Sequence, residues 1–242
     1  MIDIAGVVAS VQERIETIRD AIASIEVMME ALQIADDAHA SDLTMLVSVP
    51  YRSQWDTPAF VDGVAVDADA RRGDCGPACL AMVVAGLTDY RPTVDECGDA
   101  CGQPRSGAGS HYTNHAQLRK GARAYGLTLV TRSPYSTPLD FALIEQKLSE
   151  GKPSIALIHY GVLGDRCALY PDIVKNQDRY RGGHWVLVVG IDTDCVYIHD
   201  PDFAGSRRGD GFMRRVYRDA FDAALAAVAP GCTRGYQGLI VA

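Results

Sequence analysis

The sequence lacks the features that would point to a membrane or to nucleic acid. Lys and Arg never cluster beyond a pair and the formal net charge is −8, so neither a nucleic-acid groove nor an anionic membrane surface is an expected partner. No run approaches the roughly 18 apolar residues that span a bilayer. The N-terminus "MIDIAGVVASVQERIETIRD" has no basic region of the kind that opens a signal peptide. We therefore expect a cytoplasmic protein, or a virion-associated one if a phage encodes it.

The seven cysteines also exclude one class of protein. An odd number of cysteines in a chain of 242 residues does not fit the paired framework of a small disulfide-rich domain. Reduced thiols are favoured, and at least one should be free. The chain has no internal repeat and no low-complexity segment, and its hydrophobic content of 48% is enough for one sizeable core.

The first 35 residues carry an apolar pattern of their own. Apolar residues recur there at spacings that alternate between four and three, which is the seam of a coiled coil. They are Ile4, Val8, Val11, Ile15, Ile18, Ile22, Ile25, Met29 and Leu32. Because β-branched residues occupy both kinds of core position, three or four strands are favoured over two. We expect residues 1–35 to form a coiled-coil helix that joins copies into a homo-oligomer, a trimer being favoured, through residues 4–32.

The same pattern has a second interpretation, in which one long amphipathic helix lies on its own domain. The polar stretch over residues 36–45 is expected to be a linker in either case, which leaves residues 46–242 as the functional domain.

Strands and helices alternate through this domain. The strongest β-type segment is "HWVLVVGIDTDCVYIHDPD" (184–202), a predicted hairpin whose first strand is apolar on both faces and therefore central in its sheet. The sequence predicts an α+β fold. Helices are expected over 75–86, 114–126 and 139–152, strands over 127–132, 153–161 and 238–242, and a strand followed by a helix within 212–228.

The stretch "RRGDCGPACLAM" (71–82) places a thiol at the start of a helix. Gly73 and Asp74 precede Cys75, Asp74 is a possible cap, and Pro77 suits the first helical turn. The free backbone N–H groups and the positive end of the helix dipole stabilise a thiolate at this place. Cys75 is therefore the predicted nucleophile.

A nucleophile needs a base, and His184 is the best candidate among the six histidines. It follows two glycines and opens the central strand, where its ring can face a cleft. With a three-residue hairpin loop at 192–194, position 184 pairs with 202, which makes Asp200 a diagonal neighbour on the same face. An acid beside a histidine fixes its tautomer and stabilises the imidazolium.

Four motifs in this order resemble the papain-like bacteriocin-processing cysteine peptidases and their stand-alone relatives, which share a double-glycine-peptidase-like domain. The motifs are "SQWD", "DCGPACLAM", "GGHWVLVVGID" and "YIHDPD", and the resemblance covers most of residues 46–242. It implies a papain-like fold, in which the helix with the cysteine packs on an antiparallel sheet that carries the histidine and the aspartate. It also implies roles: Cys75 as nucleophile, His184 as general base and acid, Asp200 as orienter, and Gln54 as side-chain donor to the oxyanion.

The implied reaction is acyl transfer without a cofactor. The Cys75 thiolate attacks a peptide or isopeptide carbonyl, while Gln54 and the Cys75 N–H bind the oxyanion. The expected partner is a peptide or a cell-wall peptide. Because no transporter segment is present, the preference of exporter-fused members for paired glycines is not carried over.

Neighbours of these residues are candidates for binding substrate. Trp55 and Trp185 each adjoin a catalytic candidate and could wall the cleft, although a tryptophan is more often a core residue. Asp74 and Gly183 flank Cys75 and His184 in the same way.

Two cysteine patterns have other interpretations. Cys97 and Cys101 together with His111 and His115 could bind zinc, but their spacing differs from common zinc patterns and we predict no metal. Cys79 lies one helical turn after Cys75 and could form a reversible disulfide with it, although a small core residue is the default.

Two other functions stay open at this stage. The domain could be a catalytically silent binding or scaffold module, for example a phage structural or tail-associated part, although the presence of Cys75 argues against it. It could also be an acyl transferase or deamidase, because the same triad serves these reactions with a different acceptor.

Overall fold

The computed structural model describes residues 43–56, 60–61, 64–65, 73–104, 112–131, 140–167, 182–228 and 238–242. The chain divides into a unit of residues Met1–Ser41 and a compact unit of residues Asp42–Ala242. All described residues belong to the second unit. The predicted coiled coil through residues 4–32 lies outside the described residues.

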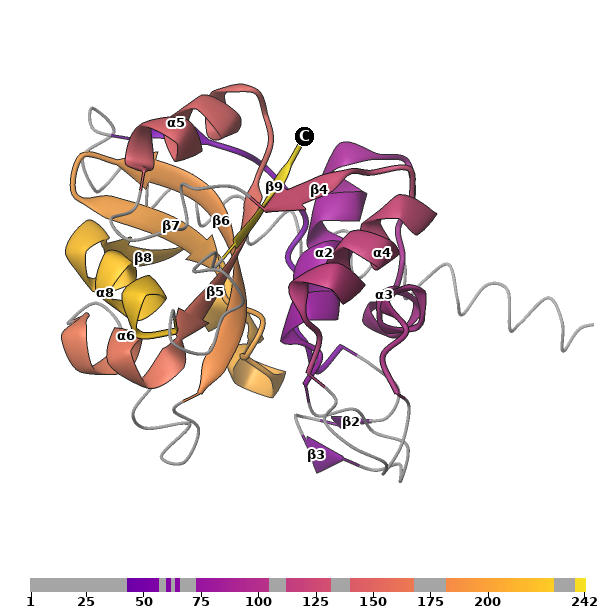
Figure 1. The fold of residues 1–242 in the computed structure, drawn as a ribbon. Coiled ribbons are helices and arrows are strands. Elements are labelled where there is room, and N and C mark those ends of the chain that lie inside the picture. The colour runs from indigo at the N-terminus through magenta and orange to yellow at the C-terminus, as the bar shows by residue number, and fades with distance from the viewer. Residues whose placement is uncertain are drawn as a thin grey trace, which may run out of the picture. The chain divides into compact units, whose positions relative to one another are not determined.

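The second unit is built on one antiparallel sheet of seven strands (Figure 1). The strand order is β4-β9-β5-β6-β7-β8, and β1 pairs with the far end of β6. A separate ribbon is formed by β2 (Phe60–Val61) and β3 (Val64–Ala65). The strands of the main sheet are β1 (Leu43–Leu46), β4 (Leu129–Thr131), β5 (Ser154–His159), β6 (Gly183–Asp192), β7 (Cys195–His199), β8 (Arg214–Tyr217) and β9 (Gly238–Val241).

Strand β6 is the centre of this sheet, as its apolar run predicts. It pairs with β5 on one side and with β7 on the other, and every residue from His184 to Asp192 is buried. A strand that is apolar on both faces can be covered on both faces without exposing hydrocarbon to water. Strand β1 begins at Leu43, which lies inside the segment expected to be a linker.

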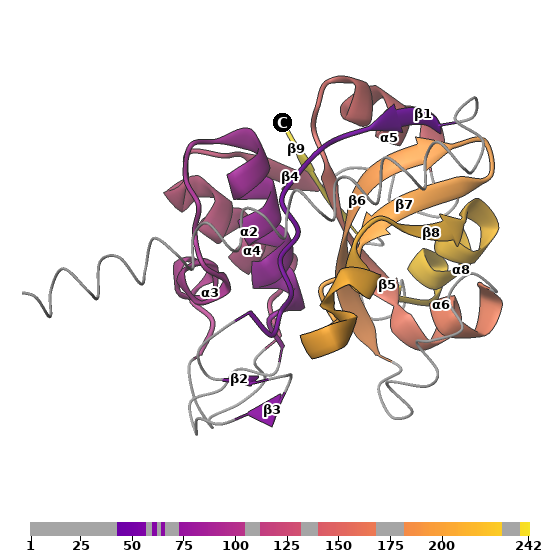
Figure 2. The same cartoon turned by 180° about the vertical axis from the view of Figure 1, so that it is seen from behind.

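Helices cover the sheet from two sides (Figures 1 and 2). The helices α2, α3 and α4 form a group in which α2 contacts β6, and α6 and α8 pack together on the opposite side against β5. This arrangement confirms the predicted α+β class. The helices are α2 (Cys75–Leu87), α3 (Val94–Cys101), α4 (His115–Ala124), α5 (Phe141–Ser149), α6 (Tyr160–Arg166) and α8 (Arg218–Val228).

Helix α2 is the core helix of the domain. Its residues from Cys75 to Ala85 are all buried, and a helix that is apolar all round is stable only when it is covered on every side. The nucleophile candidate therefore sits at the end of a rigid element. In the part of the chain that the structure describes, no helix has both the length and the apolar character needed to cross a membrane.

Side chains set the ends of several helices. Asn114 and Gln117 form a capping box at the start of α4, and Gly126 follows the end of α4 with a φ of +77°. Helix α6 was not predicted. It starts directly where β5 ends, and its first turn is capped by His159, whose Nδ1 accepts from the Val162 N–H at 3.2 Å.

The β6–β7 hairpin reaches the predicted register by a different route. Its turn contains two residues, Thr193 and Asp194, and not the three that were predicted. The register then shifts by one residue between Val188 and Gly190, so that Leu187 lies opposite His199. A bulge of this kind adds one residue to one strand only. The turn is one residue shorter than predicted and the bulge adds one residue, so the pairing of the residues beyond the bulge is the same as predicted.

The bulge decides which way the catalytic candidates face. Side chains alternate between the two faces of a strand, so a shift of one residue turns a side chain to the other face. Without the bulge, His184 and Asp200 would point to opposite faces. With it, they lie on the same face as diagonal neighbours, as the predicted register required.

Candidate active site

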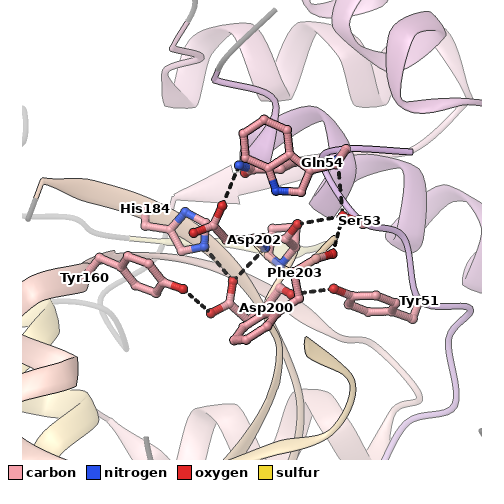
Figure 3. Close-up of polar contacts among 10 residues, drawn as sticks. Tyr51, Ser53, Gln54, Tyr160, His184, Asp200, Asp202 and Phe203 are labelled. Carbon is pink, nitrogen blue, oxygen red and sulfur yellow. Dashed lines mark hydrogen bonds and ion pairs between the residues drawn. The ribbon is translucent and has the colours of Figure 1, made fainter. Parts of the chain in front are cut away.

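His184 and Asp200 form a buried pair at the open end of the hairpin (Figure 3). His184 Nε2 lies 2.8 Å from Asp200 Oδ1, and the two residues are 3% and 0% exposed. The bond at Nε2 leaves the other ring nitrogen, Nδ1, for a further partner. Cys75 also acts on this ring, because its side chain is among the groups that raise the pKa of His184.

The Asp200 carboxylate is held by two further donors. Its Oδ2 accepts from the Tyr160 hydroxyl at 3.0 Å, and its Oδ1 accepts from the Asp202 N–H at 2.9 Å. The Tyr160 ring also packs on the His184 ring, with the centroids 4.4 Å apart. A buried carboxylate with several donors keeps its charge and its orientation.

The backbone of Asp200 is fixed as well. Its carbonyl oxygen accepts from the Tyr51 hydroxyl at 2.7 Å, and its N–H donates to Gly211 O at 2.8 Å. Gly211 lies so close that a Cβ there would be 2.1 Å from the Tyr51 hydroxyl oxygen and 2.2 Å from Asp200 O. Only a glycine fits between them.

These neighbours give His184 a high proton affinity. Burial on its own lowers the pKa of His184, but the Asp200 carboxylate and the hydrogen bonds with Asp200 and Cys75 outweigh it and hold the pKa well above 6.5. The raised pKa favours the cationic ring, and a cation beside a thiol stabilises the thiolate form.

Cys75 is the first residue of α2 and is 5% exposed. The residue after it must be small, because a Cβ on Gly76 would lie 2.1 Å from Thr113 Oγ1 and 3.1 Å from Trp185 Cδ1. The glycine of the "DCGP" motif thus lets the start of the helix pack directly against the segment before α4.

The Asp74 side chain does not cap helix α2. It occupies the N-cap position of α2, but its side chain makes no capping bond. Its Oδ1 accepts instead from Gln103 Nε2 at 2.7 Å, and the residue is 2% exposed. The Asp74 carboxylate is thus bound by Gln103, a residue that follows the end of α3, and the prediction that it caps α2 is wrong.

Gln54 reaches the site because its turn, residues 53–56, is docked on the segment after β7. Ser53 Oγ donates to Phe203 O at 2.6 Å, and Gln54 N–H donates to Pro201 O at 2.8 Å. The Gln54 side chain then donates from Nε2 to Asp202 Oδ1 at 2.8 Å (Figure 3). The candidate oxyanion donor therefore lies beside the His184–Asp200 pair.

Asp202 is a second acid in the site. Burial and the neighbouring Asp200 charge raise the pKa of Asp202, while His184 and hydrogen bonds with the Trp55 and Tyr160 side chains lower it, with a net result of about 7. The carboxyl group of Asp202 is therefore influenced both by Trp55, in the turn of residues 53–56, and by Tyr160, at the start of α6.

The other predicted binding residues differ in what they offer a ligand. Trp55 is half-buried and hydrogen-bonds Asp202, and Gly183 is half-buried at the start of β6. Trp185 is 3% exposed, and its Nε1 donates to Thr113 O at 3.0 Å. Its ring is therefore largely packed inside the domain.

The remaining cysteines of interest are buried. Cys79 is 0% exposed, and burial raises its pKa well above the ordinary value. Burial also raises the pKa of Cys97 to about 12 despite a hydrogen bond with Tyr125. Among the described residues, which exclude His111, no three side chains of metal-binding type lie close enough together to hold an ion.

The sequence-based prediction missed Tyr51, Tyr160, Ser53 and the side chain of Asp202. Ser53 and Asp202 belong to the motifs "SQWD" and "YIHDPD", and Tyr51 lies just before the first of them. Tyr160 lies inside the segment predicted as a strand, 153–161, and has no signal of its own, because its contact with Asp200 depends on the turn of the chain from β5 into α6.

Comparison with known proteins gives these observations a family context. The chain matches the model of the Peptidase_C39 like family over residues 46–223. No curated protein gives a significant match.

Several solved structures are similar at low sequence identity. A Bacillus anthracis protein assigned to the C39-like peptidases is 15% identical, with a TM-score of 0.51, and the match covers 82% of this chain and 97% of that chain. The peptidase domain of Streptococcus ComA, a bi-functional ABC transporter involved in a quorum sensing pathway, is 16% identical, with a TM-score of 0.44 and coverage of 70% and 89%. A double glycine motif protease from an AMS/PCAT transporter, solved in complex with the leader peptide, is 20% identical, with a TM-score of 0.41 and coverage of 81% and 94%.

The first of these structures supports the fold, and the family model spans more than half of the chain, including all four motifs. The predicted resemblance is confirmed: the chain belongs to the Peptidase_C39 like family.

Proposed function

We propose that the protein is a cysteine peptidase or amidase that cleaves a peptide or isopeptide bond. The observation that carries the proposal is the buried pair of His184 and Asp200, 2.8 Å apart, together with Cys75, which is among the groups that raise the pKa of His184. A nucleophile, a base and an orienting acid in one site are the minimum set for covalent acyl transfer.

In this mechanism Cys75 reacts as a thiolate. The sulfur adds to the carbonyl carbon, and the carbonyl oxygen becomes an oxyanion that accepts hydrogen bonds from Gln54 Nε2 and from the Cys75 N–H. The cationic His184 then gives its proton to the leaving amine, and the C–N bond breaks to leave a thioester on Cys75.

Hydrolysis of the thioester completes the cycle. Neutral His184 takes a proton from water, hydroxide adds to the thioester carbon, and the Cys75 thiolate leaves beside the imidazolium that has formed again. Asp200 stays ionised and keeps the ring oriented throughout, and the Tyr160 hydroxyl holds Asp200 in place.

For the substrate, the proposal names only the chemical class. Family membership supports a peptide substrate, and a cell-wall peptide is the alternative form of the same chemistry. The homo-oligomer through residues 4–32 is also part of the proposal. Light scattering should show a drop from trimer to monomer mass when the chain starts at Leu43, and an unchanged monomer would remove the oligomer from the proposal.

The first experiment needs no substrate. Native protein is alkylated with iodoacetamide at pH 4 to 9, and mass spectrometry locates the modified cysteine in the wild type and in His184→Ala. We expect Cys75 to react selectively far below the ordinary thiol pKa of about 8.5, and His184→Ala to abolish this advantage. A Cys75 that reacts like the other cysteines would favour a scaffold function instead.

A further inference from the structure

Asp202 has a side chain that the proposed mechanism does not use, although it lies in the middle of the site. Gln54 Nε2 donates to its Oδ1 at 2.8 Å, and the Trp55 side chain also hydrogen-bonds its carboxyl group. The acid thus binds two consecutive residues of the turn that carries the candidate oxyanion donor. Figure 3 shows the Gln54 amide and Asp202 on the same side of His184.

The chemistry of the two groups makes their contact directional. A glutamine amide donates at one end and accepts at the other, whereas an ionised carboxylate accepts only. With Asp202 ionised, the nitrogen of Gln54 must face it, because the amide oxygen would be repelled. An indole N–H such as that of Trp55 donates only, so the carboxylate suits both of these partners.

Gln54 keeps a free donor in this arrangement. Its Nε2 carries two N–H groups, and one of them is sufficient for the bond to Asp202. The second can be donated to an oxyanion. If the amide turned by 180°, the acceptor end would face the carbonyl oxygen of the substrate, and the site would lose this donor.

The backbone of Asp202 has a separate task. Its N–H donates to Asp200 Oδ1 at 2.9 Å, and this bond does not require the side chain. A side-chain substitution therefore removes the contact with Gln54 and leaves the backbone donor to Asp200 in place.

We propose that Asp202 is a positioning residue that holds the Gln54 amide with its nitrogen directed toward the oxyanion. The inference rests on the proposed function, in which Gln54 stabilises that oxyanion. It assigns Asp202 an effect on acyl transfer that passes through Gln54 and not through the thiol or the imidazole.

Two reactions of Cys75 distinguish an effect of Asp202 through Gln54 from an effect on the thiol or the imidazole. Both are measured on the full-length protein at pH 8, above the pKa of about 7 for Asp202. Iodoacetamide loses iodide as the sulfur alkylates, and no oxyanion forms. p-Nitrophenyl acetate is attacked at its carbonyl, passes through an oxyanion and loses p-nitrophenolate. The ratio of the ester rate constant to the alkylation rate constant therefore reports the oxyanion site, independent of the reactivity of the thiolate.

We expect Gln54→Ala to lower this ratio about 100-fold and Asp202→Ala to lower it about 10-fold, with alkylation changed less than about 3-fold. In a Gln54→Ala background, Asp202→Ala should change the ratio by less than about 2-fold, because its target is gone. Asp202→Asn, which keeps one acceptor oxygen, should be intermediate and serves if the alanine variant folds poorly. The matched control is Asp210→Ala, which removes an exposed acid that pairs with Arg207.

Equal losses in both reactions would overturn the inference, and so would an Asp202→Ala effect of full size in the Gln54→Ala background. A ratio that falls in Gln54→Ala but stays at the wild-type value in Asp202→Ala would refute the role of Asp202 alone. A ratio that Gln54→Ala leaves unchanged would refute this inference together with the oxyanion role of Gln54 in the proposed function.

Discussion

Arg208 and Asp56, which are 152 positions apart, form a bidentate ion pair with Nε 2.9 Å from Oδ1 and Nη2 2.7 Å from Oδ2. Arg208 lies in the 3-10 helix η2 (Gly205–Gly211), and Asp56 ends the turn that carries Gln54. The pair therefore ties the candidate oxyanion donor to the segment that follows Asp200.

Arg208→Ala should loosen this turn without weakening the fold. The side chains are 38% and 29% exposed, and exposed pairs contribute at most about 1 kcal/mol to the free energy of unfolding. We expect acylation of Cys75 by p-nitrophenyl acetate to slow about 5-fold, as followed by release of p-nitrophenolate. Arg207→Ala is the control, because it removes a neighbouring arginine whose ion pair is with Asp210, inside η2. An equal loss in both variants would contradict the prediction.

Tyr160→Phe should affect both stability and reactivity. It removes the donor to Asp200 Oδ2 and leaves the ring against His184. Loss of a buried hydrogen bond to a charged group should lower the free energy of unfolding by about 1.5 to 3 kcal/mol in urea denaturation, and Cys75 alkylation at pH 6 should slow. Tyr197→Phe removes a similar bond to Asp192 at the other end of the hairpin. It should cost stability and leave alkylation unchanged, and a slower alkylation there would argue against a specific role of Tyr160.

Gly76→Ala should disturb the start of α2. The added Cβ would lie 2.1 Å from Thr113 Oγ1, so the two segments must separate, at a cost of about 1 to 3 kcal/mol in the free energy of unfolding. Alkylation of Cys75 should slow because the thiol moves relative to His184.

Thr113→Ala should rescue part of this loss. Thr113 Oγ1 is buried without a hydrogen-bond partner among the described residues, so its removal costs little and opens space for the new methyl group. Restoration should be incomplete, because Trp185 Cδ1 stays 3.1 Å from the added Cβ. A double variant no better than Gly76→Ala would show that the steric explanation is incorrect.

His199 should make the fold sensitive to acid. Its Nδ1 accepts from the Met213 N–H at 3.1 Å and its Nε2 faces Val49 O at 3.3 Å, which suits the neutral ring. Burial lowers the pKa of His199 to about 4, although the backbone bonds to Val49 and Ile198 act to raise it.

The sign of the effect follows from proton binding. In the unfolded chain His199 has a pKa of about 6.5 and binds a proton below that pH. In the folded protein it binds a proton only below about pH 4. The stabilisation is therefore complete above pH 6.5 and is lost as the pH falls to about 4, by a total of about 3 kcal/mol. Urea denaturation should show a shallower decline over this window in His199→Gln than in the wild type. Parallel curves would mean that His199 titrates normally in the folded protein.

The sequence predicted those parts of the fold that have a local cause. The apolar run of β6 predicts a central strand, and the sequence Gly-Asp-Cys-Gly-Pro predicts the N-terminus of a helix, which is where α2 begins. These signals lie within a few residues of the feature that they predict. They were sufficient to bring Cys75, His184 and Asp200 into one hypothesis.

Features that depend on distant segments were missed or misjudged. The bonds of Tyr51 and Ser53 to the chain after β7 cross about 150 positions, and no local pattern encodes such a contact. Asp74 has the residue type and the position of a cap, but Gln103 competes for its carboxylate. Helix α3 was missed because few of its residues are apolar, and a capping box of Thr93 and Glu96 starts it.

The bulge in β6 has a consequence for comparing this chain with its relatives. Because the two-residue turn and the extra residue at the bulge compensate each other, the distance from histidine to aspartate along the chain is the same as in a hairpin with a three-residue turn and regular strands. Two relatives can thus align without a gap here and still differ in which residues of β6 pair with β7. Side chains between the bulge and the turn would then be assigned to the wrong face of the sheet, although the alignment of the catalytic candidates would be correct.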